Sequence, residues 1–233
     1  MSLTSVITLA VFKALKGRLT DEEAERQYRL NCVEWKDFSK KNKKKSPEGF
    51  LNEQWLLSGF LYGTADRLQE KLFFKGRQIT AKENSCEVMA TYNALLTLGR
   101  PEPFPDVLKE YAEDGICFHG IFGTDPKAVK KFFEKRGLIV TEFAGGGIER
   151  LKAEETAGDI LAGNRKRAYI FTTYNRKNNP FSMIHTMCIS VEESGFQTHN
   201  DYEGDKIYPT VYEAVVGYEK GKSGPFYALR IET

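Results

Sequence analysis

The residues that stand out for their chemistry begin with a cysteine placed where a helix is predicted to start. Cys86 lies in the stretch "KENSCEVMATYN". Asn84 and Glu87 have the spacing of a helix capping box, and apolar residues recur behind them at helical spacing. At such a position the unpaired backbone N–H groups and the positive end of the helix dipole both favour a thiolate. The pattern predicts either a nucleophilic cysteine or a buried core thiol, and the cap alone does not separate the two.

His185 is the histidine best placed to serve as the base for such a thiol. It lies near the start of "MIHTMCISV", a predicted strand, and a turn is predicted at "EESG". Beyond this turn "HND" contains Asn200 and Asp201, and Asp201 follows His185 by sixteen residues. A hairpin of this length brings a side-chain oxygen beside the imidazole, which holds the ring in the correct orientation. Asn200 and Asp201 point to opposite faces of a regular strand, so only one can serve, and we favour Asp201.

An acyl-transfer site also needs hydrogen-bond donors for the oxyanion that forms on the attacked carbonyl. The backbone N–H of Cys86 is one natural donor at the start of a helix. Gln78 lies eight residues before Cys86 and has a side-chain amide that can supply the second donor. The alternative for Gln78 is an ordinary solvated glutamine in a loop.

The elements that must position these residues fall into two parts. Helices are predicted over much of residues 1–75, with a lysine-rich loop at 40–49, and again from Asn84 and from Asp125. After about residue 138 short β-rich runs alternate with turn residues. These runs are "LIVTEFAGGG", "RAYIFTTY", "MIHTMCISVEE", "GFQTHNDY" and "PFYALRIET". Helices first and an antiparallel sheet later predict an α+β fold.

Composition excludes several other classes of protein. Charged residues make up 28% of the 233 residues and nearly balance, at a formal +2, which argues against a nucleic-acid partner bound by bulk electrostatics. No apolar run approaches the ~18–20 residues of a membrane span, and the apolar stretch at 3–15 is expected to be a helix packed on the domain. The four cysteines lack CxxC spacing, so neither a metal site nor a disulfide framework is expected, and a cytoplasmic location is favoured.

Three stretches together resemble the papain-like cysteine peptidases, and within them most closely the bacterial bacteriocin-leader (double-glycine) peptidase group. The stretches are "RQITAKENSCEVMATYNALLTLG", "GIFGTDPKAVKKFFEKRGL" and "MIHTMCISVEESGFQTHND". The resemblance covers roughly residues 75–231. It implies a papain-like domain over 76–233, in which a helical part carrying the nucleophile packs on an antiparallel sheet. Residues 1–75 form an extra N-terminal helical region, which docks a partner or covers the cleft.

The resemblance also implies a role for each candidate residue and no cofactor or metal. Cys86 is the nucleophile, His185 the general base and acid, Asp201 the orienting residue and Gln78 the oxyanion donor. The chain departs from the group in having Glu87 after the cysteine, where many members have glycine. It also has "HNDY" in place of the common Asp-Pro, which keeps Asn200 as an alternative orienting residue.

The expected function is hydrolysis of peptide bonds through an acyl-enzyme, with a peptide or protein as substrate and no nucleic acid or membrane span. One alternative keeps the fold and changes the reaction, to an amidase, a deamidase or an acyl transferase. A second alternative is a peptide-binding module without turnover. The residues leave the substrate specificity and the oligomeric state open.

Overall fold

A six-stranded antiparallel sheet runs through the centre of the computed structural model, which describes residues 3–64, 79–175, 184–201, 204, 206–217 and 224–233. The strand order is β1-β6-β2-β3-β4-β5. The strands are β1 (Ile139–Ala144), β2 (Arg167–Tyr174), β3 (Ile184–Glu192), β4 (Gly195–His199), β5 (Ile207–Tyr208) and β6 (Pro225–Glu232). They confirm the prediction of β-rich runs after residue 138.

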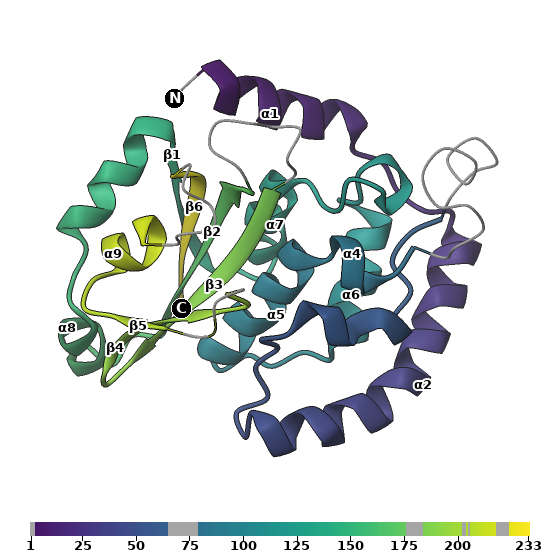
Figure 1. Ribbon diagram of the computed structural model, residues 1–233, viewed down its shortest axis with the longest axis horizontal. Helices are drawn as coiled ribbons and strands as arrows, with labels where there is room; N and C mark the ends of the chain where they lie inside the picture. The colour runs from purple at the N-terminus through teal and green to yellow at the C-terminus, as the bar shows by residue number, and fades with distance from the viewer. Residues whose placement is uncertain (1–2, 65–78, 176–183, 202–203, 205, 218–223) are drawn as a thin grey trace.

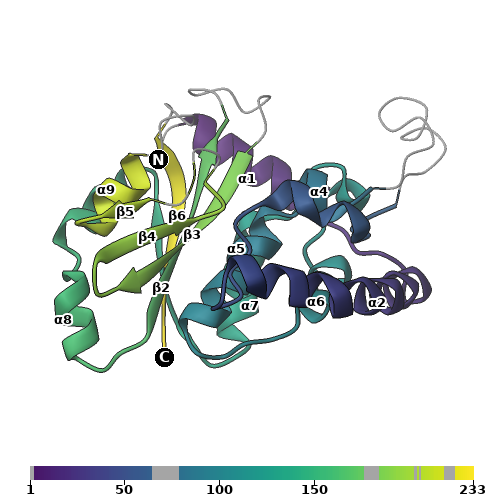
Figure 2. The same cartoon turned by 60° about the horizontal axis from the view of Figure 1, so that its bottom comes forward.

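Helices cover both faces of this sheet. They are α1 (Leu3–Leu15), α2 (Asp21–Lys45), η1 (Gln54–Gly59), α4 (Ala81–Asn84), α5 (Cys86–Thr97), α6 (Phe104–Glu113), η3 (Phe118–Gly120), α7 (Pro126–Glu134), η4 (Gly145–Ala153), α8 (Ala157–Ala162) and α9 (Val211–Val216), where η marks a 3-10 helix. In Figures 1 and 2 the helices α2 and α4 to α7 lie on one side of the sheet, while α8 and α9 lie on the other. The molecule is therefore an α+β fold, as predicted.

Strand β2 shows how the sequence divides the core between the two faces. All of its residues are buried, as expected of a central strand rich in aromatic and β-branched residues. Side chains alternate between the faces of a strand. Ala168 and Ile170 join the core on the side of α5, and Tyr169 and Phe171 join the core under α8 and α9.

The N-terminal helices share the larger of these two cores. Leu9 of α1, Ala24 of α2 and Leu57 of η1 belong to the same buried cluster as Val88 of α5. Trp35 of α2 packs its ring edge-on against Tyr92 of α5, at 5.7 Å between ring centroids. Aromatic pairs of this geometry add to the energy of area burial. Helices α1, α2 and η1 are thus built into the packing around the helix that starts at Cys86.

Two local predictions have different outcomes. The turn at "EESG" is confirmed, since β3 and β4 pair from Glu192 opposite Gly195. The lysine-rich loop predicted at 40–49 is wrong over 40–45, because α2 continues through Lys45, whereas 46–49 do lie outside the helix, with Ser46 as its C-cap. Lysine is a good helix former, and cations are favourable beside the carbonyls of a helix C-terminus. Over the described residues, we find no helix with both the length and the apolar character of a membrane span.

Candidate active site

Cys86 is the first residue of α5, but the predicted capping box is not formed. The N-cap is Ser85, whose side chain makes no capping hydrogen bond and instead donates from Oγ to Ala81 O at 2.6 Å. Asn84 Nδ2 donates to Gly120 O of η3 at 2.7 Å. The short helix α4 ends at Asn84 directly before α5, so these two side chains serve the junction between the helices. Glu87 does not complete a capping box, and its carboxyl group instead contacts the thiol of Cys86.

The thiol of Cys86 is buried and held in its protonated form. Its side chain is 8% exposed, and Sγ donates to Glu87 Oε2 at 3.2 Å. Burial raises the pKa of Cys86 well above its usual range, and the neighbouring Glu87 charge raises it further. A backbone hydrogen bond from Thr186 acts in the opposite direction. In this state the environment outweighs the lowering that a helix start alone predicts.

Glu87 joins the nucleophile helix to strand β3. It is 1% exposed, and its second carboxyl oxygen, Oε1, accepts a hydrogen bond from Thr186 Oγ1 at 3.1 Å. Thr186 in turn contacts Thr172 of β2, with 3.0 Å between the two hydroxyl oxygens. Burial raises the pKa of Glu87 to about 7. The sequence marked Glu87 as a capping residue and as a departure from the family pattern, and gave no sign of this contact with β3.

His185 lies in β3 next to Thr186 and opposite Thr173 of β2. Its Nε2 is 2.8 Å from the backbone oxygen of Asn200. A carbonyl only accepts, so this bond places the hydrogen of the neutral ring on Nε2 and the basic lone pair on Nδ1. The side chain is 1% exposed, and burial lowers its pKa to about 4. The imidazole is therefore neutral at pH 7, the form that a general base needs.

Asn200 ends β4 and holds the histidine through its backbone. It has a positive φ of 67°, a conformation that asparagine tolerates better than most residues. Its side-chain Nδ2 donates to Gln54 Oε1 at 3.3 Å, and Gln54 Nε2 donates to Lys82 O at 3.1 Å in α4. The carbonyl of Asn200, rather than its side-chain amide, is thus the group on His185. Asp201 follows it and is buried, at 5% exposed, and its role as the orienting residue stays a prediction.

Cys86 and Glu87 both contact Thr186, at the end of β3 that also carries His185. Side chains alternate along a strand, and Met187 and Ile189 belong to the core under α8 and α9, so His185 is directed to that face and Thr186 to the face of α5. The approach of the imidazole to the thiol stays a prediction. The hydrogen bonds described for the thiol and the imidazole lead to different partners, Glu87 and Asn200 respectively. Gln78 lies outside the described residues, so its predicted role is untested.

A second buried histidine, His199, anchors the chain before η1 to the sheet. Its Nε2 lies 2.9 Å from Ser190 Oγ and its Nδ1 lies 3.2 Å from Asn52 Oδ1, while Phe50 stacks on the ring at 4.0 Å between centroids. It is paired with Cys188, which belongs to the core on the α5 side. Ser190 is fully buried, so this Ser–His contact is part of the packing and is closed to a substrate.

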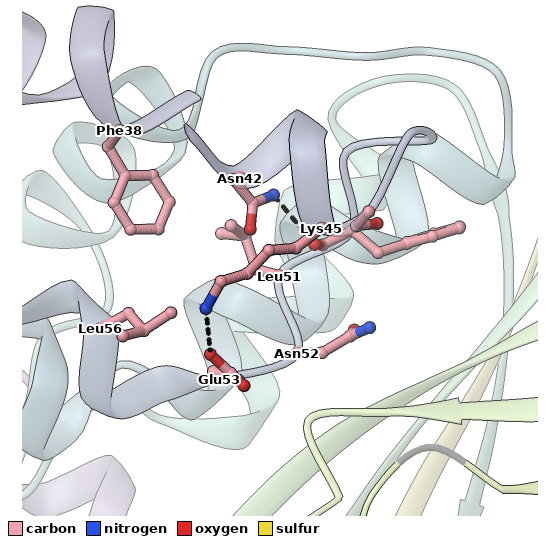
Figure 3. Close-up of a pocket in the computed structure, with 9 residues that line it drawn as sticks. Phe38, Asn42, Lys45, Leu51, Asn52, Glu53 and Leu56 are labelled. Atoms are coloured by element: carbon pink, nitrogen blue, oxygen red, sulfur yellow. Dashed lines mark hydrogen bonds and ion pairs between the residues drawn. The ribbon is translucent and has the colours of Figure 1, made fainter. Parts of the chain in front are cut away.

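A small cavity of about 190 Å³ lies beside this anchor, between the end of α2 and the following chain (Figure 3). Its lining is Phe38, Asn42, Lys45, Ser46, Phe50, Leu51, Asn52, Glu53 and Leu56. Figure 3 shows the ion pair that spans it, from Lys45 Nζ to Glu53 Oε2 at 3.3 Å. No predicted catalytic residue lines this cavity. Among the described part of the chain we also find no group of three histidine, cysteine or acidic side chains suited to hold a metal ion.

Comparisons of the chain with models of protein families, with curated proteins and with solved structures gave no match. The chemistry of the site is therefore argued from its own contacts. These are a thiol at a helix start, a buried carboxyl group bonded to it, and a neutral imidazole on the adjoining strand.

Proposed function

We propose that the chain is a cysteine-dependent amide hydrolase, and more narrowly a papain-like peptidase that acts on peptide or protein substrates. One observation carries the proposal. Cys86 at the start of α5 and the neutral His185 of β3 come to the same end of the strand, with Thr186 contacting the cysteine from the position next to the histidine. A nucleophile on a helix and its base on an adjoining strand is the arrangement that the sequence resemblance implies.

The reaction proceeds through an acyl-enzyme. Sulfur of Cys86 attacks the substrate carbonyl carbon, and the backbone N–H of Cys86 stabilises the oxyanion, with Gln78 as the second donor by resemblance. The S–H bond of Cys86 breaks as the C–S bond forms, and one proton reaches the leaving nitrogen by way of His185 as the C–N bond breaks. Water then hydrolyses the thioester. The carbonyl of Asn200 fixes the ring through Nε2. The resemblance favours Asp201 as the orienting residue, a role that it can fill only by sharing this N–H, because Nδ1 has to carry the basic lone pair.

The test compares single substitutions in hydrolysis of a complex peptide mixture, with products identified by mass spectrometry. Cys86→Ala and His185→Ala should each lower the rate by about 10³-fold or more, as loss of a catalytic nucleophile or base does in related chemistry. Cys32→Ala is the matched control, because Cys32 is a half-buried thiol away from this site and its loss should leave the rate unchanged. Products that persist at the normal rate in Cys86→Ala would refute the proposal.

A further inference from the structure

The group bonded to the thiol is a carboxylate, and the contact is fixed at both ends. Cys86 Sγ donates to Glu87 Oε2 at 3.2 Å, while Glu87 Oε1 accepts from Thr186 Oγ1 at 3.1 Å. The two oxygens of Glu87 are thus divided between the nucleophile and the strand that carries His185. Glu87 is almost fully buried, so bulk water does not compete for either oxygen.

The surroundings of Glu87 favour the uptake of a proton by its carboxyl group. The charge of Asp125, at the start of α7, raises the pKa of Glu87. The charge of Glu87 in turn raises the pKa of Cys86, of Tyr62 before α4, of Tyr111 in α6 and of Cys117 beside η3, and all of these groups are acids. A carboxylate in this setting gains by becoming neutral.

We propose that Glu87 is the first acceptor of the Cys86 proton, and therefore a catalytic residue of the cysteine hydrolase on whose proposed function this inference rests. In this step the S–H bond breaks and an O–H bond forms at Oε2, while the electron pair stays on sulfur as the thiolate. The pair carries one negative charge before and after the transfer. When the C–N bond of the substrate breaks, the nitrogen gains one proton, by way of His185, and Glu87 releases the one that it took.

The hydrogen bond of the thiol and the order of the pKa values both favour Glu87 as the acceptor of this first transfer. The thiol is already hydrogen-bonded to Glu87, whereas the described bond of the imidazole leads to Asn200. The pKa of Glu87 is raised to about 7, and that of His185 is lowered to about 4. The order of these pKa values favours a proton on Glu87 over one on His185.

The experiment measures the rate at which iodoacetamide alkylates Cys86, by mass spectrometry, between pH 5 and 9. Glu87→Gln keeps the size of the side chain and an oxygen for Thr186, but it cannot take up a proton. If Glu87 is the acceptor, this variant should be alkylated at least about tenfold more slowly than the native chain near pH 7.5. In the native chain the rate should fall as the pH drops through about 7, where Glu87 becomes protonated.

The opposite sign would overturn the inference. If Glu87 merely repels the thiolate, removing its charge lowers the pKa of Cys86, and Glu87→Gln is then alkylated faster than the native chain. An unchanged rate would also overturn it. Glu87→Asp keeps a carboxylate at a longer distance, so it should be slowed less than Glu87→Gln, and circular dichroism checks that both variants are folded.

This outcome is separable from that of the proposed function. Normal peptide hydrolysis in Glu87→Gln, together with loss in Cys86→Ala and His185→Ala, would reject the role of Glu87 and leave the hydrolase standing. Normal hydrolysis in Cys86→Ala would reject the hydrolase, while the alkylation rates would still report whether Glu87 accepts the thiol proton.

Discussion

At the scale of single residues, the site combines groups whose charged forms are all disfavoured by burial. The pKa of Cys86 and of Glu87 is raised, and the pKa of His185 is lowered. The neutral forms of all three are therefore stabilised in the folded chain. Cys86 therefore keeps its proton and His185 stays neutral at pH 7. Glu87 is the member of the three whose protonation changes near neutral pH.

The ionised form of Glu87 should lower the free energy of unfolding at alkaline pH. Its folded pKa of about 7 lies above its ordinary value of 4.5, so its contribution is fully present below pH 4.5 and is lost as the pH rises through 7. The loss, complete only well above pH 7, is on the order of 3 kcal/mol. Glu87→Gln should therefore be more stable than the native chain at pH 8, and this advantage should shrink towards pH 5. Urea denaturation at the two pH values measures it.

The buried histidines provide the contrast for this measurement. His185 and His199 have lowered pKa values, so the stability that they contribute is present above about pH 6.5 and is lost on acidification. That slope is shared by the native chain and by Glu87→Gln, so it cancels in their difference. A difference that does not change between pH 5 and pH 8 would contradict the raised pKa of Glu87.

At the scale of elements, the sequence predicted best where the local pattern decides the structure. The β-rich runs, the turn at "EESG" and the helix begun by Asp125 and Pro126 all follow from short-range rules, and Asp125 does cap α7 by accepting from Lys127 N. Helix α6 (Phe104–Glu113) was not predicted separately, although it has a strongly apolar buried face. The lysines of α2 were assigned to a loop on their charge, whereas helix propensity determined their structure.

The candidate site was predictable only in part, because local sequence patterns decide some of its features and tertiary packing decides the others. The helix start at Cys86 and the strand at His185 come from local patterns. The contact from Glu87 to Thr186 joins residues 99 positions apart and depends on how α5 packs on β3. The bond from His185 to the backbone of Asn200 depends on a left-handed residue at the end of β4, which the type of side chain does not reveal.

The β3–β4 hairpin can be tested at Gly195. Its φ is +132°, and a Cβ there would lie 2.5 Å from Tyr208 O. Gly195→Ala should therefore destabilise the protein by at least about 1–3 kcal/mol. It should also weaken the placement of Asn200 at the far end of β4, seen as slower peptide hydrolysis at a temperature where the variant is folded. Gly146→Ala is the control, because a Cβ there meets nothing within 4 Å. Equal stability of the two variants would contradict the close approach.

At the scale of the whole molecule, the shared core predicts that residues 1–75 cannot be removed without loss of folding. Leu9, Ala24 and Leu57 pack in the same cluster as Val88 of α5, and Asn31 Nδ2 donates to Leu61 O at 2.9 Å within that region. A fragment starting at residue 76 should lack the cooperative thermal transition of the full chain in circular dichroism. A fragment that unfolds cooperatively would instead identify 76–233 as an independent folding unit.

The direction of β2 has a practical consequence for experiments on this chain. At one end of the strand Thr173 is opposite His185, and Tyr174 OH lies 2.9 Å from Thr8 Oγ1 of α1. At its other end Arg167 is opposite Glu232 of β6. Figure 2 shows α1 and the C-terminus at these opposite ends. A fluorophore or a surface tether joined after Glu232 therefore stands a full strand away from the thiol chemistry, whereas one joined to α1 stands beside it.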